Sequence, residues 1–139
     1  MGKFANSMPG EAMRLLIVDD SSMIRTRISA IIEGKKLPRP LMVVASATNG
    51  ADAVQKSSML KPDLVTMDLT MPGMDGVTAI KQIMMLPDPP DILVVSALND
   101  KSTAIAALRM GARGFLTKPF TDSDLRLALL ELMENKQPQ

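Results

Sequence analysis

LVTMDLTMPGMDG, residues 64–76, is the stretch that decides the fold. An apolar run suited to a buried strand, residues 64–67, ends at Asp68, and a turn containing Pro and Gly leads into a helix that we expect to begin near Asp75. A strand, a turn and a helix in close succession are typical of α/β proteins, which place their chemistry at the carboxyl ends of their strands. Asp68 is therefore the first candidate for a functional residue.

Other short apolar runs extend this pattern along the chain, at residues 15–18, 41–44, 92–95 and 115–116. Between the runs, apolar residues recur at helical spacing: Ile24, Ile28 and Ile31; Val77, Ile80 and Met84; Ala104 and Leu108; Leu125, Leu129 and Leu132. Residues 51–60 form a weaker helical segment, and Gly34, Pro62 and Gly111 stand where helices should stop. This alternation predicts a parallel sheet with helices on both faces. The runs 15–18, 41–44 and 92–95 are continuously apolar, as expected of strands covered on both faces.

Composition narrows the class of protein. The chain has 139 residues, a net charge of +1 and no Cys or His. We expect one domain, residues 12–135, between a flexible leader of residues 1–11 and a frayed tail of residues 136–139. The charge argues against nucleic-acid and membrane binding, and the missing Cys and His exclude disulfides, a Ser-His-Asp triad and a histidine phosphodonor. Without a secretory leader or a long apolar span, a cytoplasmic protein is expected.

The methionines call for a separate interpretation, because the chain contains 13 of them. A Met-rich docking surface is one possibility, but core packing is the more common use of this flexible side chain. We therefore expect residues such as Met84 and Met85 to fill the core.

Polar residues follow most of the predicted strands: Asp19 and Asp20 the first, Asp68 the third, Ser96 the fourth, and Thr117 and Lys118 the fifth. In a parallel sheet these strand ends share one edge. Three neighbouring carboxylates repel one another, and a divalent cation relieves that repulsion. A few protein oxygens completed by water suit Mg²⁺ better than Ca²⁺. A carboxylate beside Mg²⁺, with a Lys and a hydroxyl nearby, can attack phosphorus and form an aspartyl phosphate.

Each of these residues also has an ordinary structural interpretation. Asp20 or Ser21 could cap the following helix, Asp68 and Lys118 could be loop residues, and Ser96 a strand-end hydroxyl. Their shared position at one edge favours a site instead. Two other acidic residues, Asp75 and Asp100, are expected near helix starts, and the basic residues are expected on a solvated face; these are Arg25, Arg27, Lys35, Lys36 and Arg39.

Four motifs, in order along the chain, carry a resemblance to a known family: LLIVDDSSMIR (15–25), DLVTMDLTMPGMDG (63–76), VVSA (94–97) and GFLTKPF (114–120). They resemble response-regulator receiver domains of the CheY type, and the likeness extends from about residue 14 to residue 134. The resemblance implies a flavodoxin-like (βα)5 fold with a doubly wound, five-stranded parallel sheet of order 2-1-3-4-5. In that order the first and third strands are adjacent, so Asp19, Asp20 and Asp68 should converge.

The resemblance also implies roles for individual residues. Asp68 would accept a phosphoryl group from a sensor histidine kinase or from a small acyl phosphate. Asp20, Asp68 and the backbone carbonyl of Thr70 would bind Mg²⁺, with Asp19 acting through water. Lys118 would pair with the phosphoryl oxygens, and its bond to Pro119 would be cis.

The same resemblance implies a two-state switch. Ser96 would move to the phosphoryl group, and Phe115 would turn inward into the space that Ser96 leaves. The changed surface, formed by the fourth helix, the fifth strand and the fifth helix, would bind a downstream protein. Phe115 stands where CheY proteins of enteric bacteria have Tyr, although other family members also have Phe there. Thr70 and Leu98 hold positions that tune dephosphorylation. Leu98→Glu is expected to change the phosphoryl lifetime without abolishing phosphorylation.

Several functions remain open from the sequence. A stand-alone, chemotaxis-like switch that catalyses only its own phosphorylation and dephosphorylation fits best, because no output domain follows the last helix. Arg113 and Gly114 replace the acidic pair of the dimer-forming OmpR type, which disfavours that dimer. The chain could also be the receiver of a transcription factor or a chemotaxis methylesterase. A haloacid dehalogenase-type phosphatase needs a second Asp where Thr70 stands. A flavodoxin-like FMN site is disfavoured because Asp19 and Asp20 would repel the FMN phosphate.

Overall fold

The computed structural model describes residues 12–34, 37–97, 99 and 101–135, and within them five strands alternate with five helices. In chain order these are β1 (Met13–Val18), α1 (Ser22–Gly34), β2 (Leu41–Ala47), α2 (Gly50–Leu60), β3 (Leu64–Met67), α3 (Gly76–Ile83), β4 (Asp91–Ala97), α4 (Lys101–Met110), β5 (Gly114–Lys118) and α5 (Asp122–Asn135). The predicted leader and tail lie outside the described residues, as do Lys35, Lys36, Leu98 and Asp100.

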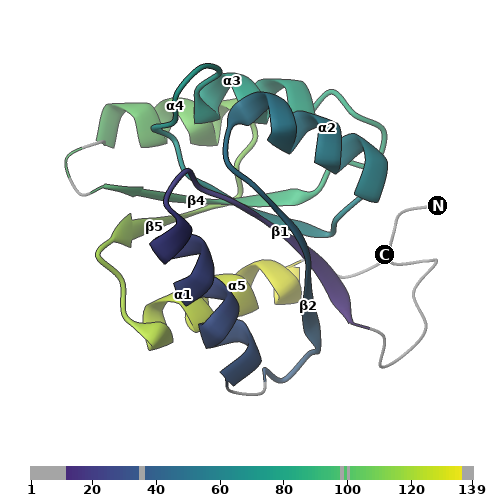
Figure 1. The fold of residues 1–139 in the computed structure, drawn as a ribbon, viewed down its shortest axis with the longest axis vertical. Coiled ribbons are helices and arrows are strands. Elements are labelled where there is room, and N and C mark those ends of the chain that lie inside the picture. The colour runs from purple at the N-terminus through teal and green to yellow at the C-terminus, as the bar shows by residue number, and fades with distance from the viewer. Residues whose placement is uncertain (1–11, 35–36, 98, 100, 136–139) are drawn as a thin grey trace.

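The strands form one parallel sheet in the order β2-β1-β3-β4-β5, which confirms the predicted topology. Figure 1 shows α1 and α5 on one face of this sheet and α2, α3 and α4 on the other. Because the chain moves outward from β1 to β2 and then returns to β3, β1 and β3 are neighbours, with Val18 opposite Met67. The carboxyl ends of these two strands therefore lie side by side.

An apolar core fills each side of the sheet. Successive side chains of a strand point to opposite faces, so Val65 and Met67 of β3 join the core under α2, α3 and α4, whereas Leu64 joins the core under α1 and α5. The helical repeats seen in the sequence supply the other side of each core, for example Ile80 on α3 and Leu129 on α5. All four residues of β3 are buried, so the strand that leads to Asp68 is held from both faces.

Two sequence-based expectations about burial were wrong. β2 was predicted to be covered on both faces, but it is the edge strand, and only its last residue, Ala47, is buried. An edge strand has one neighbour, and its register with β1 is interrupted next to Leu15. Met84 packs against the core as expected, whereas Met85 is 77% exposed.

The observed helix starts agree with the sequence-based predictions better than the burial of β2 and Met85 does. Asp75 caps α3, where its carboxylate accepts a hydrogen bond from the Thr78 N–H at 2.8 Å, which confirms its predicted place at a helix start. Ser21 rather than Asp20 supplies the side-chain oxygen for the first turn of α1, accepting from the Ile24 N–H at 3.3 Å. No helix in the described part of the chain is both long and apolar enough to cross a membrane.

Candidate functional site

Three carboxylates meet where β1 and β3 end. Asp19 and Asp20 follow β1, Asp68 follows β3, and the Asp68 N–H continues the ladder by donating to the Val18 carbonyl at 2.9 Å. One carboxylate oxygen from each residue lies within 4.8 Å of those of the other two. Asp19 and Asp68 are buried, whereas Asp20 is exposed. The predicted convergence of these three residues is therefore present.

Lys118 reaches the same point from the end of β5. Its ammonium nitrogen lies 2.9 Å from Asp19 Oδ2 and 3.7 Å from Asp68 Oδ1, and the side chain is three-quarters buried. The Lys118–Pro119 peptide bond is cis. A cation this close to two carboxylates can pair with any further anionic oxygen brought to Asp68.

The surroundings of Asp68 disfavour its ionised form. Burial raises the pKa of Asp68 from 3.8 to about 6, and the nearby carboxylate of Asp19 adds to the rise. The Thr70 N–H, which donates to Asp68 Oδ1 at 3.1 Å, and the ammonium of Lys118 both lower this pKa but do not cancel the effect. A carboxylate held this way gains strongly from a cation placed beside it.

The residues present fit a divalent cation. Lys118 brings one positive charge to three carboxylates, two of which are buried, so the cluster keeps excess negative charge when all three are ionised. The donor atoms are all oxygens, which hard cations prefer. Asp19, Asp20 and Asp68 thus form a cluster that could bind a metal, with the exposed Asp20 on its solvent side.

Ser96 and Phe115 lie on the two strands beyond β3. Ser96 is 1% exposed near the end of β4, the strand next to β3, and it pairs in register with Thr117 of β5. Phe115 is 36% exposed and pairs with Val94. Ser96 is therefore buried on the strand beside that of Asp68, while Phe115 is partly exposed.

Two glycines allow the backbone of α2 and α3 to lie very close to the loop between β3 and α3. A Cβ atom added to Gly76 would lie 2.5 Å from the Asp68 carbonyl oxygen, and one added to Gly50 would lie 2.6 Å from the Met74 carbonyl oxygen. The first turns of α3 and α2 therefore approach this loop from two directions, closer than any other residue would allow. The close approach supports the backbone that carries Asp68 and Thr70.

Two arginines predicted to be solvated are instead bonded to loops of the site. The Arg25 guanidinium donates to the Asp19 carbonyl oxygen at 2.7 Å. Arg27 donates to the Phe120 carbonyl oxygen, lies 4.5 Å from the centre of the Phe120 ring, and pairs with Asp122 at 3.6 Å. The Arg27 contacts join residues far apart in sequence, and the Arg25 contact reaches back across the turn before α1. Helical periodicity alone predicts neither.

The chain matches the family model for the response regulator receiver domain over residues 15–130. The chemotaxis protein CheY of Bacillus subtilis strain 168 is 45% identical over 109 residues, which are 78% of this chain and 88% of that protein. CheY of Thermotoga maritima is 43% identical over 116 residues, 84% of this chain and 93% of that protein.

Longer proteins and solved structures show the same likeness. A protein-glutamate methylesterase/protein-glutamine glutaminase of Pseudoalteromonas translucida is 43% identical over 112 residues, 80% of this chain but 28% of that protein. The crystal structure of the response regulator domain of Thermotoga maritima CheB superposes with a TM-score of 0.77 at 37% identity, covering 92% of this chain and all of that one.

Proposed function

Because this chain belongs to the response regulator receiver domains, we propose that it is a phosphorylatable signalling switch in which Asp68 accepts the phosphoryl group. The observation that carries the proposal is a buried strand-end carboxylate in reach of both an ammonium and two further carboxylates. Ordinary loop acids are solvated, and this arrangement serves a nucleophile whose product is an anion held in place.

The chemistry expected of Asp68 is a direct displacement at phosphorus. An ionised Asp68 oxygen forms the new O–P bond, the P–N bond of a phosphohistidine on a kinase breaks, and the electron pair stays on the imidazole nitrogen. Lys118 lies close enough to Asp68 to pair with an oxygen of the transferred group, giving up part of its contact with Asp19. A small acyl phosphate would serve as a donor in the same way.

Mg²⁺ is the cation we propose for the carboxylate cluster. Asp20, Asp68 and the Thr70 carbonyl would hold it, with Asp19 contributing through water. When bound, it supplies positive charge that keeps Asp68 ionised and offsets the charge of the phosphoryl group. The chain's own contribution is to hold the carboxylates together and to keep Asp68 largely away from bulk water.

The response of the molecule is proposed to run from Ser96 to Phe115 and then to the surface of α4, β5 and α5. Large apolar side chains are already exposed on these elements, namely Ile105, Leu108, Met110, Phe115 and Leu127. Singly exposed apolar residues are common, but five on adjoining elements suit a docking face for a downstream protein. The partial exposure of Phe115 is what we expect before phosphorylation.

We propose a chemotaxis-like role, since CheY proteins are similar to this chain over most of their length. Its catalysis would be limited to its own phosphorylation and dephosphorylation. The methylesterase relatives support a second candidate, the receiver of a longer regulator of that kind. Phosphorylation-dependent binding to a flagellar-switch peptide would favour the first role, and regulation of an added methylesterase catalytic domain would favour the second.

The central experiment measures intact mass after incubation with acetyl phosphate and Mg²⁺. One added phosphoryl group is expected on the wild type and none on Asp68→Asn, and chelation of Mg²⁺ should prevent the reaction. Lys118→Met is expected to fold and to be phosphorylated much more slowly. Equal labelling of wild type and Asp68→Asn would refute Asp68 as the acceptor.

A further inference from the structure

Arg25 makes a contact that the proposed reaction does not use. The residue lies in the first turns of α1, and its guanidinium Nη1 donates to the backbone carbonyl of Asp19 at 2.7 Å. The side chain thus runs back from the helix to the loop that joins β1 to α1. A hydrogen bond from a charged donor is among the stronger ones in proteins, so this contact ties the loop to the helix.

With the Arg25 contact, every polar group of Asp19 has a hydrogen-bond partner. The Asp19 N–H donates to the Ala47 carbonyl at 3.1 Å, Oδ1 accepts from the Ser21 N–H at 2.9 Å, and Oδ2 pairs with Lys118 at 2.9 Å. The carbonyl held by Arg25 belongs to the rigid peptide plane that also contains the Asp20 N–H. Fixing that plane restricts where the Asp20 carboxylate can lie relative to that of Asp19.

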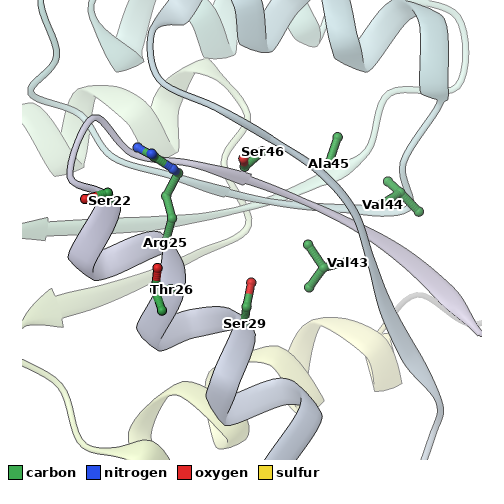
Figure 2. Close-up of a pocket in the computed structure, with 8 residues that line it drawn as sticks. All are labelled: Ser22, Arg25, Thr26, Ser29, Val43, Val44, Ala45 and Ser46. Carbon is green, nitrogen blue, oxygen red and sulfur yellow. The ribbon is translucent and has the colours of Figure 1, made fainter.

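The other side of Arg25 faces open space rather than a packed core. Together with Thr26, Ser29 and Ser46, it lines a cavity of about 400 Å³ between α1 and β2. In Figure 2 its side chain rises from α1 beside this cavity, and the neighbouring side chains are short. Shortening Arg25 would therefore remove a polar contact without opening a hole in the apolar core.

We infer that Arg25 is a positioning residue for the metal site, which acts by holding the Asp19–Asp20 peptide so that both carboxylates face the same cation. The inference rests on the proposed function, because it concerns the same carboxylate cluster. Arg25 does not touch the cation in this account; it acts through the main chain of Asp19.

The charge of Arg25 and its hydrogen bond to Asp19 should have opposite effects on Mg²⁺ affinity. A guanidinium near the cluster repels an incoming cation, so removal of its charge alone should tighten Mg²⁺ binding. Loss of the hydrogen bond should instead weaken binding, because the Asp20 carboxylate becomes less well placed. The direction of the change shows which effect dominates.

The test compares Mg²⁺ affinity in four proteins, by following backbone amide chemical shifts during titration with magnesium chloride. Arg25→Met removes both charge and donor and is expected to weaken binding about tenfold, the lower end of the usual cost of losing an outer-shell partner. Arg25→Lys keeps the charge and a donor and should recover part of that loss. Arg113→Met is the matched control, since Arg113 pairs with Asp91 at the opposite end of the sheet; its affinity should equal that of the wild type.

A second measurement works without the metal. Hydrogen exchange of the Asp20 and Ser21 amides in metal-free protein should be faster in Arg25→Met than in the wild type, and little changed in Arg113→Met. If Arg25→Met does not fold, Arg25→Lys carries the test, with an expected loss of a few-fold from its shorter reach.

The possible outcomes separate this inference from the proposed function. Equal or tighter Mg²⁺ binding by Arg25→Met, or equal binding by Arg25→Lys where Arg25→Met is unfolded, would overturn the positioning role alone. Failure of the wild type to bind Mg²⁺ would overturn the metal site and the inference together. Weaker binding with partial recovery in Arg25→Lys would support the inference.

Discussion

At the scale of single residues, Asp68 is the proposed nucleophile, and its own surroundings oppose its ionisation. Burial raises its pKa to about 6, and the carboxylate of Asp19 pushes in the same direction. Its reactivity should therefore depend on pH in a range where most Asp residues are fully ionised. A bound divalent cation would shift the balance back toward the carboxylate.

The carboxyl ¹³C resonance of Asp68 in metal-free protein should accordingly titrate near pH 6, and Mg²⁺ should move its midpoint downward. Asp68→Asn identifies the resonance.

The raised pKa of Asp68 also has a consequence for the stability of the fold. Because the folded state binds this proton more tightly than the unfolded state, stability from Asp68 is present at low pH and is lost as the pH rises through 6. In metal-free protein Asp68→Asn should therefore raise the free energy of unfolding by up to about 3 kcal/mol at about pH 8 and by little at about pH 4. A titration midpoint near 4 for the Asp68 carboxyl resonance would contradict the raised pKa on which both predictions depend.

A second prediction about stability concerns Thr66, whose buried hydroxyl can be removed by substitution. Its hydroxyl lies in β3 with no hydrogen-bond partner among the described residues, and the residue is buried. Thr66→Val keeps the shape and removes the cost of burying the hydroxyl, so the free energy of unfolding should rise by about 1 kcal/mol. Chemical denaturation measures the change. The exposed Thr78 on α3 provides a control, since Thr78→Val should change stability by less than about 0.5 kcal/mol. A loss of stability in Thr66→Val would show that the hydroxyl is hydrogen-bonded in solution.

At the scale of elements, the loop after β3 is set by how closely two helices approach it. Gly76→Ala would place a Cβ atom 2.5 Å from the Asp68 carbonyl oxygen and 2.6 Å from the Leu69 Cα atom, and these backbone atoms cannot move without moving Asp68. We expect a loss of about 1–3 kcal/mol in the free energy of unfolding and slower phosphorylation by acetyl phosphate. Gly34→Ala is the matched control, because its Cβ atom would meet nothing within 4 Å, and its phosphorylation rate should be unchanged. Equal rates in the two variants would show that this close approach does not position Asp68.

The elements also show what the sequence can and cannot predict. Apolar repeats such as Ile24, Ile28 and Ile31 predicted α1 because each helix buries one face. The polar strand ends predicted that three carboxylates converge, because parallel strands end at one edge. The burial of β2 was wrong because a local apolar run looks the same at the edge of a sheet as at its centre. The contact between Arg25 and Asp19 depends on a side-chain direction across a turn, and no repeat in the sequence records it.

At the scale of the whole molecule, the proposed site and the proposed docking face share the strand β5. Ser96 lies buried near the end of β4, and Phe115 lies on β5, whose last residue is Lys118. β5 thus carries both Lys118, whose charge would meet the phosphoryl group, and Phe115, whose ring would respond to it. A change at Asp68 biases the surface only if the arrangement with an inward ring is more stable with the phosphoryl group than without it.

This coupling can be followed with fluorine NMR, since the chain has only three Phe residues and no Trp or Tyr. With 4-fluorophenylalanine incorporated, the resonance of Phe115, assigned through Phe115→Leu, should shift after phosphorylation as the ring leaves solvent. Phe120, which is already buried beside Arg27, is an internal reference and should shift less.

Ser96→Ala separates the two steps of the proposed switch. Intact mass should still show a phosphoryl group on this variant. The Phe115 resonance should stay near its unphosphorylated position, because the hydroxyl proposed to link the phosphoryl group to the ring is missing. Asp68→Asn should show neither change. If the Phe115 resonance of the fully phosphorylated wild type does not move, the ring takes no part in the switch, and the signal must reach α4 and α5 by another route. If it moves equally in Ser96→Ala, the ring responds to the phosphoryl group without Ser96, and the charge of Lys118 at the end of the same strand becomes the more direct link.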